Sequence, residues 1–234
     1  LYGASPMSPT RLLEGMERIG PVFSQLYGQT ECYPISLLRK ADHDARRPER
    51  FASCGMPLAG RDVRLLGDDG QEVAPGEAGE ICVRADSAMA LYWNQPELTA
   101  EALAGGWLHT GDIARQDEEG YLYIVDRKKD MVVSGGFNVF TAEVEAAVTE
   151  LAQVREACVF GIPHEKWGEQ VHAVVVAEGI TGAEIIAYAK DRLGGVKAPK
   201  SVEFVDAIPR TAAGKMDKKA LRVKYWGDAQ RMVN

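Results

Sequence analysis

A chain of 234 residues with 46% hydrophobic side chains can build one large domain or two modest ones, each with its own core. Its formal net charge of −7 argues against nonspecific nucleic-acid binding, which needs a broad basic face. The sequence contains no run of about 18 apolar residues, so no membrane span is predicted. The cysteines lie far apart without the spacing of zinc ligands, which predicts reduced thiols in a cytoplasmic protein and argues against zinc: Cys32, Cys54, Cys82 and Cys158.

The first elements are a helix and a strand. Ser8–Ile19 predicts a helix because Ser8 can cap it, Pro9 fits the first turn, and one face is apolar: Leu12, Leu13, Met16 and Ile19. Residues 21–27 predict a strand that ends in the polar turn 28–31.

From about Gly55 to Val125 the pattern changes to short strands divided by turns. Alternating apolar residues predict strands over 62–66, 80–84 and 121–125, and Gly67-Asp68-Asp69-Gly70 is a clear turn signal. This region is predicted to be a small, mostly antiparallel β unit.

The character changes again after Asp130, where a compact α+β module of about a hundred residues is predicted. Thr141 can cap a helix whose apolar face holds Val144, Ala147, Val148 and Leu151. Strands are expected at 154–162, 170–177 and 201–206, and helices at 183–193 and 217–225. The charged run Asp126-Arg127-Lys128-Lys129-Asp130 is the best boundary candidate.

Two turns in the first half carry groups suited to a nucleotide. Tyr27-Gly28-Gln29-Thr30-Glu31 sets backbone amides, a hydroxyl and a carboxylate side by side, which can hold a phosphate and Mg²⁺. Asp112, in Gly106-Trp107-Leu108-His109-Thr110-Gly111-Asp112, can accept both hydroxyls of a ribose. Either stretch taken alone also fits an ordinary polar turn, and His109 fits a packed or surface histidine.

Cationic and glycine-rich segments stand out in the second half. Lys215 follows Gly214 on a small-residue loop, and residues 192–224 hold nine basic against three acidic side chains, which suits an anionic ligand such as a nucleotide phosphate. Arg127 can pair with ribose or phosphate oxygens, and the Gly135-Gly136 pair fits either a hairpin turn or close approach of a ligand to bare backbone.

Taken in order, these motifs resemble those of the adenylate-forming superfamily, which contains acyl-CoA synthetases, luciferases and peptide-synthetase adenylation domains. The similarity runs through essentially the whole chain, at Gly3-Ala4-Ser5-Pro6, Tyr27–Glu31, Gly106–Asp112, Asp126–Asp130 and Pro209–Lys215. Asp130–Gly136, followed by Asn138 and Glu143, is similar to the CoA-ligase variant, although Phe137 and Thr141 depart from it.

The resemblance implies an α/β plus α+β fold. Residues 1–129 correspond to the end of the large AMP-binding domain, with a β subdomain from about 54, and residues 130–234 to a mobile α+β lid with its hinge near Asp130. The superfamily's phosphate-gripping loop is not among these residues, so the chain is expected to be part of a longer enzyme and inactive alone for the full reaction.

The implied activity is that of a magnesium-dependent acyl-CoA synthetase, which joins a fatty or aromatic acid to CoA through an acyl-adenylate and releases AMP and pyrophosphate. The catalytic residues are Lys215, Thr30 and Glu31, the last holding Mg²⁺. ATP or AMP is expected to contact Gly3, Ala4, Ser5, Tyr27, Gly28, Gln29, Thr30, Asp112, Arg127 and Lys215, and CoA to contact Gly135, Gly136 and Trp167.

Two rival interpretations stay open, an adenylation enzyme that loads a carrier protein and a non-catalytic nucleotide-binding remnant. The acid itself, whether aryl or fatty, is not readable from the sequence, and self-association into a homodimer is also left open.

Overall fold

The computed structural model describes residues 1–3, 7–212 and 214–226 and divides into two compact units. Unit 1 is Leu1–Val125, and unit 2 begins at Asp126, inside the charged run in which the sequence analysis placed a boundary at Asp130. No helix in the described part of the chain is long and apolar enough to cross a membrane.

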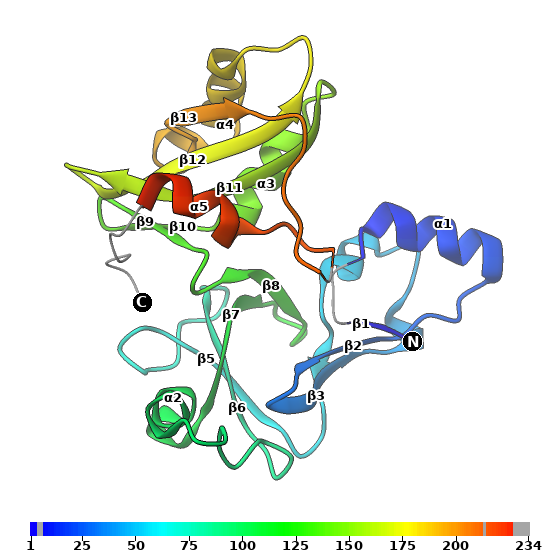
Figure 1. Cartoon of the computed structure of the whole chain (residues 1–234). Helices are drawn as coiled ribbons and strands as arrows, with labels where there is room; N and C mark the ends of the chain where they lie inside the picture. The colour runs from blue at the N-terminus through cyan, green and yellow to red at the C-terminus, as the bar shows by residue number, and fades with distance from the viewer. Residues whose placement is uncertain (4–6, 213, 227–234) are drawn as a thin grey trace. The chain divides into compact units, whose positions relative to one another are not determined.

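Unit 1 contains two four-stranded sheets, shown in blue to green in Figure 1. The first has the order β1-β2-β3-β4, from Tyr2–Gly3, Gln25–Gln29, Cys32–Leu38 and Met56–Pro57. The second has the order β5-β6-β7-β8, from Asp62–Leu66, Gly79–Arg84, Leu108–Gln116 and Leu122–Arg127. The helical segments are α1 (Pro9–Ile19), η1 (Lys40–Asp42), η2 (Pro48–Ala52), α2 (Pro96–Ala102) and η3 (Ala104–Gly106).

Helix α1 begins as its sequence predicts, with the Ser8 hydroxyl accepting the Arg11 N–H at 3.3 Å. Leu12 is completely buried, but Ile19 is 64% exposed, so the predicted apolar face is one turn too long. The strand expected at residues 21–27 lies instead at Gln25–Gln29, and α2 replaces a stretch for which only strands were predicted.

One core joins the two sheets of unit 1. It contains Tyr27, Cys32, Ile35 and Cys54 from the first half of the unit and apolar side chains of β5 to β8, among them Ile81 and Leu122. The two halves of unit 1 therefore fold around shared buried surface rather than as separate pieces.

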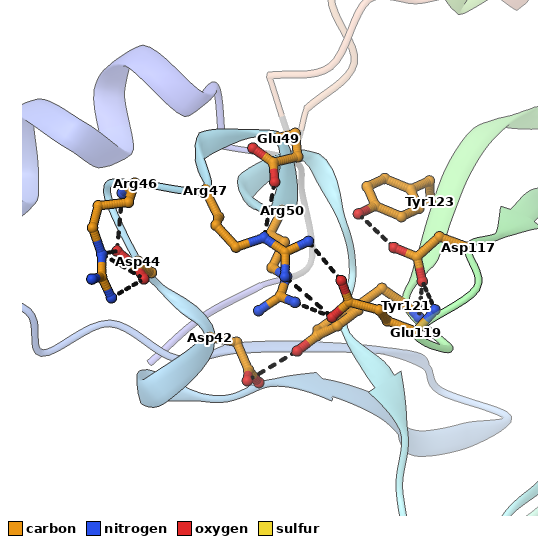
Figure 2. A network of polar contacts seen from close by, with 10 residues as sticks. All are labelled: Asp42, Asp44, Arg46, Arg47, Glu49, Arg50, Asp117, Glu119, Tyr121 and Tyr123. Atoms are coloured by element: carbon orange, nitrogen blue, oxygen red, sulfur yellow. Dashed lines mark hydrogen bonds and ion pairs between the residues drawn. The ribbon is translucent and has the colours of Figure 1, made fainter.

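A surface network links η2 to the turn between β7 and β8 (Figure 2). Arg47 and Arg50 both pair with Glu119, and the Arg50 guanidinium lies 4.7 Å from the centre of the Tyr121 ring. The Tyr121 hydroxyl donates to Asp42 at 3.0 Å. These contacts fix the segment between β3 and β4 against the second sheet.

Unit 2 is a sheet with helices on both faces. The sheet contains β9 (Val132–Ser134), β10 (Phe137–Val139), β11 (Val154–His164), β12 (Gly168–Ala177) and β13 (Ser201–Phe204), in the order β10-β9-β12-β11 with β13 parallel to β12. The helices are α3 (Thr141–Thr149), α4 (Gly182–Lys197) and α5 (Lys218–Trp226).

The alternation of β11 explains this arrangement, because successive side chains point to opposite faces of a sheet. Ala157 and Val159 belong to the core that α3 and α4 cover, whereas Cys158 and Phe160 belong to a second core with Leu221 and Tyr225 of α5. In Figure 1, α5 (red) and α3 (green) lie on opposite sides of β11. Unit 2 therefore buries both faces of its central hairpin.

Candidate functional site

The two nucleotide-type turns of unit 1 meet at one hydrogen bond. The Tyr27 hydroxyl donates to Asp112 Oδ2 at 2.8 Å across a sequence separation of 85 residues, and both side chains are buried. Burial, followed by the charge of Asp112, raises the pKa of Tyr27, so this hydroxyl stays protonated and acts as a donor. Asp112 is thus held in a fixed direction at the middle of β7.

A bulge in β7 sets the position of Asp112. The β6–β7 ladder shifts register between Glu80 and Cys82, and Gly111 takes the left-handed conformation at φ +70°. The buried carboxylate of Glu80 accepts the Gly111 N–H at 2.9 Å, and the Thr110 hydroxyl donates to Ile81 O at 2.8 Å. The glycine before the aspartate is therefore required by backbone geometry.

Thr30 and Glu31 form the two-residue turn between β2 and β3. Thr30 is exposed, and Glu31 is half-buried with Oε1 accepting the Tyr92 hydroxyl at 2.7 Å. Burial, followed by Glu31, raises the pKa of Tyr92 to about 12. Gly28 stands opposite a register shift in β3, where a side chain would contact Cys32 O at 2.9 Å.

Gly3 lies on β1, at the edge of the first sheet. It pairs with Leu26 through the parallel β1–β2 ladder, and a Cβ on Gly3 would lie 2.4 Å from Leu26 O. Bare backbone is therefore needed there. The predicted contacts of Ala4 and Ser5 lie outside the described residues.

Lys215 of unit 2 lies on a closed loop and is exposed. The Thr211 N–H donates to Lys215 O, and the Gly214 N–H donates to Thr211 O, each at 2.8 Å. Arg210 fastens the loop to β11 by donating to Glu156 at 2.8 Å. Gly214 has a φ of +79° and closes this turn, so its contribution is the turn geometry.

A buried polar cluster supports the same end of unit 2. Lys218 Nζ lies 2.9 Å from Glu145 and donates to the Thr141 hydroxyl at 2.7 Å, and Asp126 accepts the Thr141 N–H. Burial raises the pKa of Asp126 and of Glu145, and the Lys218 ammonium opposes both shifts. The predicted capping role of Thr141 is wrong, because the cap residue of α3 is Phe140 and the Thr141 hydroxyl serves this cluster.

The charged residues around the boundary are anchored within unit 2. Asp130 accepts Arg222 Nη2 at 3.0 Å, which ties the segment before β9 to α5. The Arg127 N–H donates to Asp126 at 2.8 Å, whereas its side chain is exposed.

Gly135 and Gly136 form the two-residue turn of the β9–β10 hairpin, and both have positive φ, as a primed turn requires. The Gly135 N–H donates to Trp167 O at 2.9 Å. Trp167 is 36% exposed and stacks on His164 with the ring centres 4.2 Å apart. The structure thus brings together three residues that the sequence analysis assigned to one ligand.

Sequence reasoning missed the groups that support these positions. Glu80 holds the Gly111 amide next to Asp112, and Tyr92 holds Glu31, but no local pattern marks either residue because its partner is distant in sequence. Within the described residues, unit 1 offers a hydroxyl and two carboxylates, and unit 2 offers exposed cations and bare backbone. A hydroxyl and carboxylates can bond the hydroxyl groups of a ligand, and an exposed ammonium can pair with an anion.

Comparison with known proteins defines the family. Residues 1–93 match the model of the AMP-binding enzyme, and residues 143–215 match the AMP-binding enzyme C-terminal domain. The chain is 49% identical to the medium/long-chain-fatty-acid–CoA ligase FadD8 of Mycobacterium tuberculosis over 99% of its own length, and 43% identical to a feruloyl-CoA synthase of Amycolatopsis over 96%. It spans 42% and 46% of these relatives, about half of their length.

Solved structures support the same family assignment. The amide bond synthetase McbA of Marinactinospora thermotolerans is 39% identical with a TM-score of 0.83, and ATP-bound MatB of Rhodopseudomonas palustris is 32% identical with a TM-score of 0.84. The matches cover 96% and 97% of this chain and 46% and 45% of those chains. The chain belongs to the adenylate-forming family of AMP-binding enzymes and corresponds to its C-terminal portion.

Proposed function

We propose that this chain is part of an acid–CoA ligase, which activates a carboxylic acid with ATP and transfers the acyl group to CoA. The observation that carries the proposal is the hydrogen bond between Tyr27 and Asp112, because it places two nucleotide-type motifs at one position in unit 1. The CoA ligases among the relatives support this reaction class.

Adenylation is needed because a carboxylate does not react with a thiol when an oxide-like oxygen is the leaving group. One carboxylate oxygen bonds to the α-phosphorus of ATP and pyrophosphate departs, which gives the acyl-adenylate. Negative charge on the phosphate oxygens then requires a fixed cation. The exposed ammonium of Lys215 fills this role on its closed loop, and Lys215→Ala is expected to lower the adenylation rate by about 10²–10³.

The nucleotide contacts follow from the chemistry of each group. The Asp112 carboxylate accepts hydrogen bonds from the ribose hydroxyls, with Arg127 as a second ribose contact, and the exposed Thr30 hydroxyl donates to phosphate. Backbone at Gly28 and Gln29 is proposed to flank the phosphates, and Gly3 is proposed to contact the adenine.

The residues present fit a magnesium ion. Glu31 is half-buried, and Tyr92 engages one of its two oxygens, which orients a carboxylate able to serve as an oxygen ligand. A bound Mg²⁺ would supply positive charge against the phosphates of ATP. Glu31→Gln keeps the size of the side chain and is expected to weaken metal dependence.

Thioester formation is assigned to the hairpin turn of unit 2. The CoA thiol loses its proton to solvent, its sulfur bonds to the acyl carbonyl carbon, and the bond from that carbon to the AMP oxygen breaks so that AMP departs. Asp130 acts as the hinge of the lid, Gly135 and Gly136 let the pantetheine chain pass bare backbone, and Trp167 stacks on the CoA adenine. The exposed glycine turn next to a partly exposed indole supports this assignment.

The test uses Gly136→Trp in the native polypeptide that contains this chain. Acid-dependent exchange of labelled pyrophosphate into ATP is expected to stay within about twofold, whereas thioester formation falls roughly 10²-fold. Gly179→Trp is the matched control, because both glycines have positive φ and open space around them. If Gly136→Trp lowered both half-reactions equally while Gly179→Trp lowered neither, the proposed path of the pantetheine chain past Gly135 and Gly136 would be refuted.

The same assay separates the acceptors and the acids. Saturation by free CoA supports a CoA ligase, transfer only to a carrier protein supports the loading enzyme, and an absence of exchange supports a binding remnant. A panel of fatty and aryl acids identifies the substrate class. The four buried free cysteines support a cytoplasmic location for the whole enzyme, and its mass in solution tests a homodimer.

A further inference from the structure

Three potential metal ligands lie together on one face of the second sheet of unit 1. Glu80 and Cys82 are two residues apart on β6, so their side chains share a face, and His109 of β7 is the direct cross-strand partner of Cys82. Glu80 and Cys82 are buried, and His109 is partly exposed. The sequence hid this grouping because 27 residues separate Cys82 from His109.

The spacing of the ligand atoms is that of a coordination sphere. His109 Nδ1 lies 3.1 Å from Glu80 Oε2 and 3.4 Å from Cys82 Sγ, and all three atoms lie within 4.8 Å of one another. Zinc bonds of about 2.0–2.1 Å to nitrogen or oxygen and about 2.3 Å to sulfur place neighbouring tetrahedral ligands roughly 3.3–3.6 Å apart. Small shifts of the side chains therefore suffice for a metal to enter.

The hydrogen bonds around the cluster aim the lone pairs inward. His109 Nε2 lies 3.3 Å from Ala104 O, a carbonyl that can only accept, so a proton on Nε2 is satisfied there and Nδ1, which faces Glu80 and Cys82, can serve as the metal ligand. Metal-bound histidines are held by the same kind of carbonyl contact. Glu80 keeps Oε1 on the Gly111 N–H, which leaves Oε2 directed at the cluster.

The three ligand atoms surround one position that a cation can occupy. Glu80 Oε2 and His109 Nδ1 face each other at 3.1 Å, where a proton or a metal ion can join them, and a metal that enters displaces that proton to solvent. A divalent metal satisfies both together with the thiolate, and the sum of Zn²⁺, one carboxylate and one thiolate is neutral, which lowers the cost of burial. The competing arrangement is a proton on Nδ1, which pairs with Glu80 alone.

We infer that Glu80, Cys82 and His109 form a binding site for one thiophilic divalent cation of the zinc class. On binding, the Cys82 S–H bond breaks, the proton passes to solvent and a metal–sulfur bond forms. A fourth position stays open on the exposed side of His109. The site lies beside the bulge that holds Asp112, but the inference does not depend on the proposed catalytic roles.

The test is a Co²⁺ titration of the native polypeptide, with zinc competition. We expect one equivalent with an intense near-ultraviolet thiolate-to-cobalt band that Zn²⁺ abolishes, and a thermal midpoint raised by several degrees with either metal. Cys82→Ser and His109→Gln are expected to lose the band and weaken binding at least tenfold. Cys32→Ser is the matched control, since this buried thiol lies near Ser87 and outside the cluster.

A spectroscopic measurement on the wild-type protein keeps the test independent of folding in the variants. X-ray absorption at the zinc edge is expected to show one sulfur at about 2.3 Å and lighter ligands at about 2.0–2.1 Å. Zinc with only oxygen and nitrogen neighbours, a cobalt band that persists in Cys82→Ser, or no binding of either metal would each overturn the site.

Discussion

Lys218→Met is the most informative single change in unit 2, because it removes the cation from a cluster with two buried carboxylates. At 2.9 Å, the attraction between Lys218 and Glu145 is roughly 6 kcal/mol gross at an effective dielectric constant of 20, before desolvation is subtracted. The two side chains are only 17% and 22% exposed. Breaking such a pair strands Glu145 and Asp126, and unit 2 is expected to lose about 3 kcal/mol.

The loss has a defined pH dependence. Burial raises the pKa of Asp126 and of Glu145 above 3.8 and 4.5, so the protonated forms favour the folded state. That contribution is fully present below the unfolded pKa values and is lost as pH rises through the folded values. Without the opposing Lys218 ammonium the folded values rise further, so the destabilisation should be large at pH 8 and smaller at pH 5.

Urea-dependent amide hydrogen exchange of peptides from α3 and β11 measures the stability of unit 2 separately. Lys219→Met on the same helix is the control and should change stability by less than about 0.5 kcal/mol, because this side chain is exposed. Adding Glu145→Gln to Lys218→Met should restore most of the loss. A loss that does not vary with pH, or an equal loss in the control, would refute the reasoning.

Three further changes test the structure elsewhere. Tyr27→Phe removes the donor to Asp112 and should weaken AMP binding by about 1.5 kcal/mol, or roughly tenfold, in calorimetric titration of the native polypeptide; an unchanged Kd contradicts this. Burial lowers the pKa of His172 below 6.5, so its neutral form stabilises the fold at higher pH and that contribution is lost as pH falls; His172→Phe should flatten the stability profile of unit 2 between pH 7 and 5, as hydrogen exchange would show. Gly55→Ala places a Cβ 2.0 Å from the Leu37 carbonyl carbon and should lower the thermal midpoint far more than the control Gly60→Ala. The control has open space around it and loses about 1–2 kcal/mol for its left-handed backbone alone. Similar midpoints for the two variants would show that the backbone near Leu37 moves to accept the new Cβ.

Local patterns predicted the elements whose neighbours in sequence are also their neighbours in space. The strand at Asp62–Leu66 has the bounds that were expected, since alternation and the turn 67–70 specify it locally. The start of the helix after Ser8 was also predicted, because the Ser8 hydroxyl caps the N–H of Arg11, only three residues away. Thr141 was misassigned because the competing partner, Asp126, comes from a strand outside the local window.

The candidate site shows the same division. The motifs indicated Thr30, Asp112, Gly135 and Lys215 by residue type and order, but no local sequence feature predicted the residues that support them. Those supports are contacts such as Glu80 with the Gly111 amide and Trp167 with the glycine turn. Each depends on strand register, which pairs residues that are distant along the chain.

The amino-acid sequence by itself determined the family, the order of the elements and the types of group available for chemistry, because caps, turns and alternation are short-range properties. Only the tertiary structure decided which of those groups meet. Tyr27 reaches Asp112 because the sheets of unit 1 share one core, and Glu80 and Cys82 reach His109 because the β6–β7 register places Cys82 opposite His109. Register and burial are set by packing across the whole unit, and no local stretch of sequence encodes them.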